Sequence, residues 1–267
     1  MADERAELAS IAASLRAHLE LQWEAGTTGI PRAPKKAAPG PSPSPNPSPS
    51  PSPSLSPSPS PSPSPSPSPA PAPPRSLAVL AEQVSTCTLC GLSKTRTKTV
   101  FERGNREAAL CFVGEAPGAD EDAQGLPFVG RAGQLLDKMI AAMGLSPERD
   151  VYVCNILKCR PPDNRRPTPE ETATCIPYLH EQLANVSPKV IVALGNTAAQ
   201  ALLDTKLGIT RLRGQWKLYR GKSLVMPTYH PSYLLREGPT QRTAKQEAWD
   251  DLQKVMKELG LSSPKKP

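Results

Sequence analysis

The sequence has no apolar run long enough to span a membrane, because stretches of about 18 consecutive apolar residues are missing from its 267 residues. Its N-terminus, MADERAELAS, is charged and lacks the apolar segment of a secretory signal peptide. We therefore expect no contact with a membrane and a cytoplasmic location. In a reducing compartment six cysteines are not expected to form a disulfide framework, so closely spaced cysteines predict a metal or redox site.

Histidine is scarce, with three residues, and aromatic residues make up only 4% of the chain. The sequence shows no cluster of histidines and carboxylates, which argues against a phosphate-ester hydrolase that uses a divalent metal. The net charge of +7 permits binding to a polyanion such as nucleic acid. A solvated basic surface explains that charge equally well.

Proline is abundant: the chain holds 34, mostly in a Pro-Ser alternation within residues 30–75. Such a segment cannot build a core, so we expect a disordered, semi-rigid polyproline II linker. Before it, residues 4–24 predict an amphipathic helix within an N-terminal segment 1–29. Either segment is a candidate for binding a protein partner, although plain spacing and loose packing also explain them. A folded domain is predicted over 76–262, followed by a basic tail at 263–267.

Apolar runs alternate with amphipathic segments through the folded domain, which predicts a three-layer α/β/α architecture with a mainly parallel sheet. The predicted strands are 108–114, 151–157, 189–194 and 224–226. The predicted helices are 77–84, 132–143, 169–186, 197–203 and 243–259.

The first predicted strand ends at Gly114 and leads into a loop that continues to Gly130. This loop contains four glycines, two prolines and four acidic residues. In an open α/β sheet a junction between a strand end and a helix is a usual ligand site. The alternative is an ordinary surface loop with solvated acids.

Four of the six cysteines lie outside the predicted strands, and two of these form a C-x-x-C pair. The four are Cys87, Cys90, Cys159 and Cys175. Four thiolates can hold zinc or an iron-sulfur cluster, and their spacing does not decide between the two. Four unrelated thiols are the remaining alternative. Cys111 and Cys154 lie inside strands, where cysteine behaves as a small apolar residue.

Three motifs, in this order, accompany the four cysteines: GEAPGADEDAQGLPFVGRAGQLLD, NILKCRPPDNRRP and HPSYLLR. Together they closely resemble the family 4 uracil-DNA glycosylases, the iron-sulfur class of bacteria and archaea. The resemblance covers roughly Leu77 to Leu259. It implies a four-stranded parallel sheet between helices and a 4Fe-4S cluster on the four thiolates. It also implies a base excision repair enzyme that removes uracil from damaged DNA and leaves an abasic site.

Two residues are candidates for holding a uracil that has left the helix. Phe128 can supply a stacking face, or it is simply part of the core. The amide of Asn155 can accept from uracil N3–H and donate to O4, and cytosine presents the opposite pattern. The alternative for Asn155 is to cap the end of its strand.

The resemblance places His230 at uracil O2 as a neutral donor, with a structural histidine as the alternative. The backbone N–H groups of Glu115 and Ala116 would assist it, and Gly114 belongs to the same substrate-binding set. Glu115 and Glu121 are the candidate acids. One of them is expected to orient water or stabilise the sugar cation, and one to line the cavity wall that excludes a 5-methyl group. Many members of the superfamily carry Asp where Ala116 stands, so we expect water positioning and electrostatics to matter more than a strong base.

Contacts with DNA are predicted for two groups of residues. Ser232 is expected to grip phosphates and Leu234 to fill the gap left by the extruded base. A basic rim is predicted from Lys158, Arg160, Arg165, Arg166 and Arg236. We expect a monomer that acts on uracil-containing DNA. The alternative from another class is a non-catalytic, metal-stapled module that binds DNA or protein.

Overall fold

The computed structural model describes residues 75–261. The predicted N-terminal helix, nearly all of the Pro/Ser linker and the basic tail lie outside the described residues. No helix within the described part of the chain is long and apolar enough to cross a lipid bilayer.

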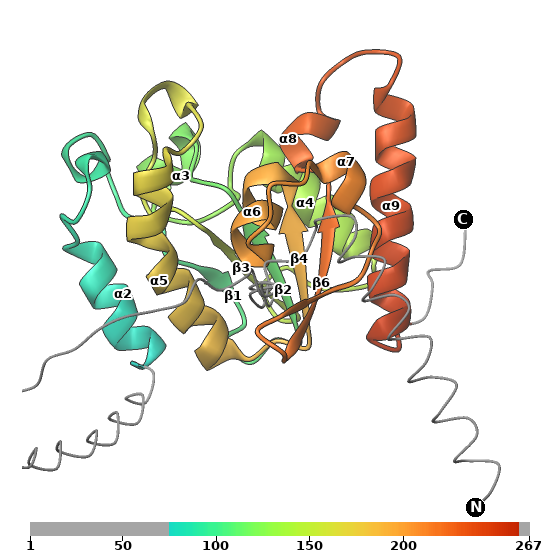
Figure 1. Ribbon diagram of the computed structural model, residues 1–267, viewed down its shortest axis with the longest axis horizontal. Coiled ribbons are helices and arrows are strands. Elements are labelled where there is room, and N and C mark those ends of the chain that lie inside the picture. The colour runs from blue at the N-terminus through green and yellow to red at the C-terminus, as the bar shows by residue number, and fades with distance from the viewer. Residues whose placement is uncertain (1–74, 262–267) are drawn as a thin grey trace, which may run out of the picture. The chain divides into compact units, whose positions relative to one another are not determined.

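Six strands form one mixed sheet in the order β1-β3-β2-β4-β6-β5 (Figure 1). The four central strands run parallel: β2 (Leu110–Gly114), β3 (Val151–Asn155), β4 (Val190–Leu194) and β6 (Ser223–Thr228). Two short strands pair antiparallel at the edges: β1 (Arg103–Gly104) and β5 (Lys217–Tyr219). The predicted α/β class and its four parallel strands are confirmed, and the two edge strands extend the sheet beyond the prediction.

The central strands form because their residues are continuously apolar and their side chains are covered on both faces of the sheet. Every residue of β2, β3 and β4 is buried. Gly114 pairs with Asn155 in the parallel register, so β2 and β3 end at the same level. The loops that follow these strands therefore leave the sheet side by side.

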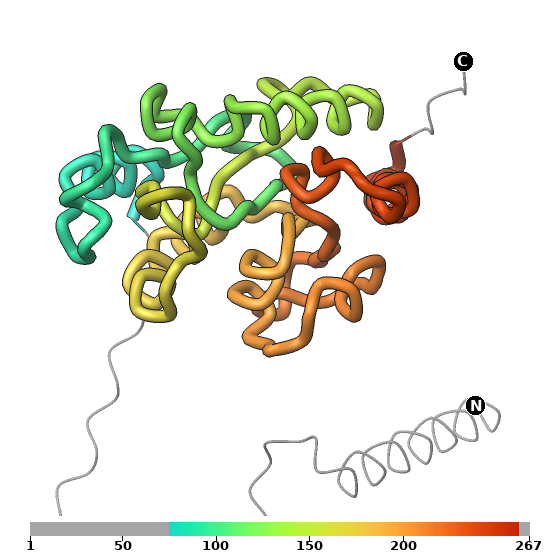
Figure 2. Tube along the Cα trace, turned by 90° about the horizontal axis from the view of Figure 1, so that it is seen from above, coloured from blue at the N-terminus to red at the C-terminus, as the bar shows by residue number. Residues whose placement is uncertain are grey.

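Five longer helices cover the sheet: α2 (Leu77–Ser85), α4 (Arg131–Ala142), α5 (Pro169–Val186), α6 (Gly195–Leu203) and α9 (Gln241–Glu258). Shorter helical turns lie in the connections: η1 (Gly91–Lys94), α3 (Ala119–Gln124), η2 (Pro162–Asn164), α7 (Ile209–Leu212) and α8 (Pro231–Leu234). One hydrophobic cluster joins α2, α5 and α6 to one face of the sheet, and a second joins α4 and α9 to the other. Figure 2 shows these two helical layers on opposite sides, which confirms the three-layer architecture.

A buried carboxylate ties α9 to the end of β6. Asp251 is fully buried and accepts hydrogen bonds from Thr228 Oγ1 at 2.8 Å and from Arg213 Nη2 at 2.7 Å. Tyr229, which follows Thr228, donates its hydroxyl to Glu247 on the same helix. These contacts fix the point at which the chain leaves the sheet toward α8.

Candidate functional site

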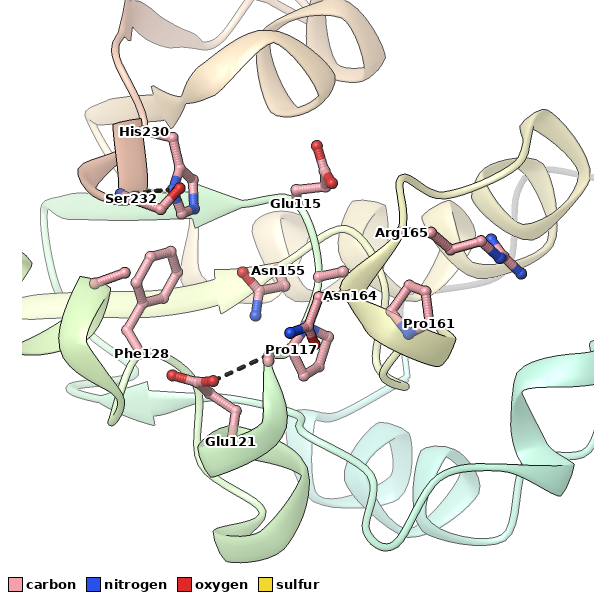
Figure 3. A pocket seen from close by; sticks show the side chains of 13 residues that line it. Glu115, Pro117, Glu121, Phe128, Asn155, Pro161, Asn164, Arg165, His230 and Ser232 are labelled. Carbon is pink, nitrogen blue, oxygen red and sulfur yellow. Dashed lines mark hydrogen bonds between the residues drawn. The ribbon is translucent and has the colours of Figure 1, made fainter. Parts of the chain in front are cut away.

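A cavity of about 230 Å³ lies where β2, β3 and β6 end (Figure 3). We call it the strand-end cavity, and its lining comes from the glycine-rich loop after β2, the end of β3 with the following loop, and α8. Its lining residues are Glu115, Ala116, Pro117, Gly118, Glu121, Phe128, Ala132, Asn155, Pro161, Asn164, Arg165, His230 and Ser232. The three side chains predicted to hold a base, Phe128, Asn155 and His230, are therefore brought together from three separate segments.

Asn155 is the last residue of β3 and is only 1% exposed. Its Oδ1 is buried and has no hydrogen-bond partner among the described residues. Leaving a buried acceptor unpaired costs about 1–3 kcal/mol, so such an atom calls for a donor from outside the protein. The strand end therefore presents a buried amide whose oxygen is available to a ligand.

Phe128 is 5% exposed and belongs both to the hydrophobic cluster beside α4 and to the cavity wall. Its backbone has a φ of 56°, a strained conformation for an aromatic residue. A Cβ atom at Gly114 would lie 2.5 Å from Phe128 Cζ and 2.3 Å from Asn155 Oδ1. Gly114 does not line the cavity, and its function is to let these two side chains approach each other.

His230 lies next to Phe128, with the two ring centroids 5.6 Å apart. Its Nδ1 accepts the backbone N–H of Ser232 at 3.1 Å, so the ring proton sits on Nε2. Burial lowers the pKa of His230 to about 4, so the ring is neutral at neutral pH. The residue therefore offers a neutral N–H donor on Nε2, and its place at uracil O2 stays a prediction.

The two candidate acids have different surroundings. The Glu121 carboxylate accepts three backbone N–H groups, from Gly118 at 3.0 Å and from Val129 and Gly130 at 2.9 Å each. It therefore organises the loop that carries Phe128. The Glu115 carboxylate accepts the hydroxyl of Thr197 on α6, and its second oxygen takes no side-chain hydrogen bond within the described residues. A catalytic role stays a prediction for both.

The predicted basic rim is divided by the structure. Arg165 lines the cavity and forms a bidentate pair with Glu171, at 2.6 and 2.9 Å. Arg166 is exposed, and Arg160 donates to Asn164 Oδ1 at 2.8 Å. Lys158 was wrongly predicted as a rim residue, because it is only 1% exposed and its amine points into the interior.

The prediction for Leu234 does not fit its position either. Leu234 is 2% exposed and packs with Ala244 and Ala248 of α9, so it cannot fill a gap in DNA without leaving the core. Leu235, which follows it, is partly exposed. Ser232 is exposed beside the cavity, and its Oγ lies 2.8 Å from His230 Nδ1.

A second cavity is lined by all four cysteines that lie outside the strands. This four-cysteine cavity lies between α2, the loop after β3 and α5, and its lining is Val84, Cys87, Cys90, Arg96, Lys158, Cys159, Thr174, Cys175 and Tyr178. Arg96 Nη1 lies 3.2 Å from Cys159 Sγ, and the backbone N–H of Lys158 lies 3.4 Å from Cys175 Sγ. Burial raises the pKa of Cys175 to about 11, so its thiolate needs a positively charged ligand or metal centre.

The four cysteines surround this cavity rather than a single point. Within residues 75–261 no three potential ligands among His, Cys, Asp and Glu are grouped closely enough to hold one metal ion. Four thiols around one cavity, with N–H groups directed at two sulfurs, are the donor set of a four-thiolate cluster. The residues present therefore fit such a group.

Several residues that line the two cavities, or that contact a lining residue, escaped the sequence analysis. Thr197 stands 82 positions from Glu115, and Arg96 stands 63 positions from Cys159. Neither belongs to a motif, so only the folded chain brings them to their partners. Asn164 and Pro161 lie inside a motif, but nothing in its letters shows that they face the strand-end cavity.

Residues 101–253 match the model of the uracil DNA glycosylase superfamily. The chain is similar to the type-4 uracil-DNA glycosylase of Thermotoga maritima, with 48% identity over 161 residues, which cover 60% of this chain and 83% of that protein. It is also similar to the type-4 uracil-DNA glycosylase of Archaeoglobus fulgidus, with 43% identity over 198 residues, which cover 71% of this chain and 96% of that protein.

Proposed function

The chain belongs to the uracil DNA glycosylase superfamily and is a type-4 uracil-DNA glycosylase, and we propose that the strand-end cavity is where it holds uracil extruded from DNA. The observation that carries this proposal is the buried Oδ1 of Asn155, which has no partner within residues 75–261 and shares the cavity with Phe128 and His230. A flat ring stacked on Phe128 would bring its edge to this amide.

In the proposed complex Asn155 discriminates uracil from cytosine. Its Oδ1 accepts the N3–H of uracil, and its Nδ2 donates to O4. Cytosine has an acceptor at N3 and a donor at its exocyclic amine, so both contacts become unfavourable. A buried amide that is held in one orientation can reject such an isostere strongly, because the mismatch leaves polar groups unpaired.

Hydrolysis breaks the bond between uracil N1 and the sugar C1′, and the bonding electrons leave with the base. We propose that His230 Nε2–H donates to uracil O2, where part of this charge collects. The lowered pKa keeps the His230 ring neutral. The neutral ring stabilises the uracil anion by the hydrogen bond from its Nε2–H. Water then attacks C1′ and gives up a proton, and the uracil anion takes up a proton, so the products are neutral uracil and an abasic site.

Glu115 is the acid that we assign to the sugar side of the reaction. Thr197 holds its carboxylate from behind, which leaves an oxygen to orient water or to stabilise positive charge on the sugar. Glu121 is committed to three backbone N–H groups, so we assign it to loop organisation and to the cavity wall.

The surrounding surface is proposed to bind the DNA backbone. Two candidates line the cavity, Arg165 and Ser232, and two more lie in the loop after β3, Arg160 and Arg166. Arginine and serine side chains are common partners of DNA phosphates. Catalysis in a monomer and a cytoplasmic location remain predictions from the sequence.

The four-cysteine cavity is proposed to hold a 4Fe-4S cluster through Cys87, Cys90, Cys159 and Cys175. When bound, the cluster supplies metal-sulfur bonds that tie α2 to α5 and to the loop after β3. These bonds would fix the backbone that continues directly from Asn155.

The function is tested with an oligonucleotide that contains one uracil. Incubation followed by alkali should cut the strand at the uracil, and the double variant Asn155→Ala, His230→Ala should lower the rate by more than about 10³-fold. The matched control is Asn185→Ala, His180→Ala, which removes the same residue types from α5 outside the cavity. Equal cleavage by the two double variants would reject the assigned site, and binding that ignores uracil without cleavage would favour the non-catalytic module.

A further inference from the structure

Lys158 lies between the two cavities and is almost completely buried, at 1% exposed. Its Nζ donates to the backbone oxygen of Asn155 at 2.6 Å and to the side-chain oxygen of Gln182. Both acceptors are neutral. The amine also lies over the Phe101 ring, 5.8 Å from its centroid. A buried ammonium is unfavourable unless negative charge lies nearby, so these three uncharged partners do not fully offset its charge.

Gln182 links the amine to a carboxylate, because the Tyr152 hydroxyl to which it donates in turn donates to Glu102. Gln182 is fully buried, and its Nε2 donates to the backbone oxygen of Phe101 at 3.1 Å and to the hydroxyl of Tyr152 at 2.8 Å. This fixes its Oε1 toward Lys158, and the Glu102 carboxylate is separated from the amine by Gln182 and Tyr152. We therefore look for a closer negative charge on another side of the amine.

The four-cysteine cavity provides that side. Lys158 lines it, its backbone N–H is directed at Cys175 Sγ at 3.4 Å, and it directly precedes Cys159. Four thiolates carry more negative charge than the core of an iron-sulfur cluster neutralises, and a nearby cation stabilises such a centre.

We propose that Lys158 is a positioning residue that balances the charge of the four-cysteine centre and, through the Asn155 carbonyl, holds the uracil-reading amide in place. The inference rests on the proposed function of the strand-end cavity. It means that the cluster contributes to base recognition through one buried side chain, since Lys158 contacts the strand end that carries the amide.

The test uses the purified holoenzyme and the variant Lys158→Met, which keeps an unbranched side chain, one heavy atom shorter, and removes the amine. Two quantities are measured: the rate at which a chelator bleaches the visible colour of the cluster, and kcat/KM for uracil excision. We expect bleaching to accelerate and kcat/KM to fall by about tenfold or more, the usual cost of losing a hydrogen bond from a charged group. Gln182→Met is the matched control, because it disturbs the same network without removing the charge, and its bleaching rate should stay near that of the wild type.

A double-mutant cycle separates positioning from general damage to the fold. If Lys158 acts through Asn155, adding Lys158→Met to Asn155→Ala should lower kcat/KM by no more than about twofold, while bleaching still accelerates. Equal losses in both backgrounds would overturn the positioning role, and unchanged bleaching would overturn the charge role.

A second variant covers the case in which Lys158→Met does not fold. Lys158→Gln keeps an N–H donor near the Asn155 carbonyl but carries no charge, so bleaching should accelerate with a smaller loss of excision. Bleaching equal to the wild type would again reject the charge role. A wild-type protein that leaves uracil DNA intact would reject the proposed function instead, and the bleaching rates would still decide whether Lys158 serves the centre.

Discussion

The strand-end cavity and the four-cysteine cavity differ in how their polar atoms are satisfied. In the first, Asn155 Oδ1 is buried without a partner in the part of the chain that the structure describes, and His230 keeps an N–H donor in the same cavity. In the second, Arg96 and the backbone of Lys158 already direct N–H groups at two of the sulfurs. Unpaired groups suit a ligand that arrives and leaves, whereas hydrogen bonds to the sulfurs suit a group that stays bound.

The two cavities also meet in one short piece of chain. Asn155 ends β3 and lines the strand-end cavity. Cys159, four residues further along the chain, lines the four-cysteine cavity. Damage to the base-reading side should therefore appear mainly in catalysis, and damage to the cysteine side mainly in stability. The following experiments test that division.

The largest effect is expected from Cys175→Ser. A purified wild-type protein should be brown, and this variant should be colourless and lose more than about 4 kcal/mol of its free energy of unfolding, as is typical when a metal site is lost. Absorption spectra and thermal melts provide the measurement. Cys111→Ala is the control, because Cys111 is buried in β2 and should not affect the colour. A colourless, folded wild type that contains zinc would contradict the iron assignment.

Gly114→Ala should act on catalysis. The new Cβ would lie 2.3 Å from Asn155 Oδ1 and 2.5 Å from Phe128 Cζ, so both side chains must move. We expect kcat/KM for uracil to fall by about 100-fold with the cluster retained. The matched control is Gly91→Ala, where a Cβ meets nothing within 4 Å. Comparable activity in the two variants would show that the contact between Phe128 and Asn155 is not needed.

The pH dependence should reveal the state of His230. Its pKa is lowered from 6.5 to about 4 by burial, so the neutral donor persists in mild acid. Between pH 7 and 5.5 we expect kcat/KM to fall by less than about twofold, against about tenfold for a histidine of ordinary pKa. A titration near pH 6.5 that disappears in His230→Ala but persists in His180→Ala would contradict this assignment.

The lowered pKa of His230 also determines how the free energy of unfolding changes with pH. Between pH 6.5 and 4 the unfolded chain binds a proton at His230 that the folded protein does not. The free energy of unfolding should therefore decrease as the pH falls through this window. His180, whose pKa burial also lowers to about 4, contributes in the same direction, so only the variant pair separates the two.

The smallest effect is expected from deleting residues 1–74. This segment contains the Pro-Ser tract, which cannot contribute to a core, and the deletion keeps Arg75, whose backbone oxygen accepts from Asn185. Excision of uracil from short DNA should change by less than about twofold. A larger loss would show that the N-terminal arm belongs to the working enzyme.

The sequence predicted the centre of the fold because uninterrupted apolar runs mark buried strands. The end of β2 at Gly114 followed from those runs, whereas β3 was predicted to continue to Leu157 and ends at Asn155. It did not predict α3, because ADEDAQ has no apolar stripe and forms a helix through the contact of Glu121 with Gly118 N–H. The edge strands were missed because two or three residues carry no periodic signal.

The errors at the site have physical causes that lie outside the motifs. Lys158 stands among prolines and arginines, a pattern typical of a solvated loop, yet its amine is buried against Asn155 and Gln182. Leu234 and Leu235 are neighbours in one helical turn, and only the position of α9 decides which of them is covered. Tertiary contacts settle both cases, and local sequence does not encode them.

The two edge strands have a consequence for association between molecules. The parallel centre of the sheet is rich in valine, and its edges, if exposed, would be templates for strands of other chains. β1 covers one edge with two residues, Arg103 and Gly104, and β5 covers the other with three, beginning at Lys217. Such short, charged borders offer few free backbone groups, so growth of the sheet into aggregates is disfavoured at both sides.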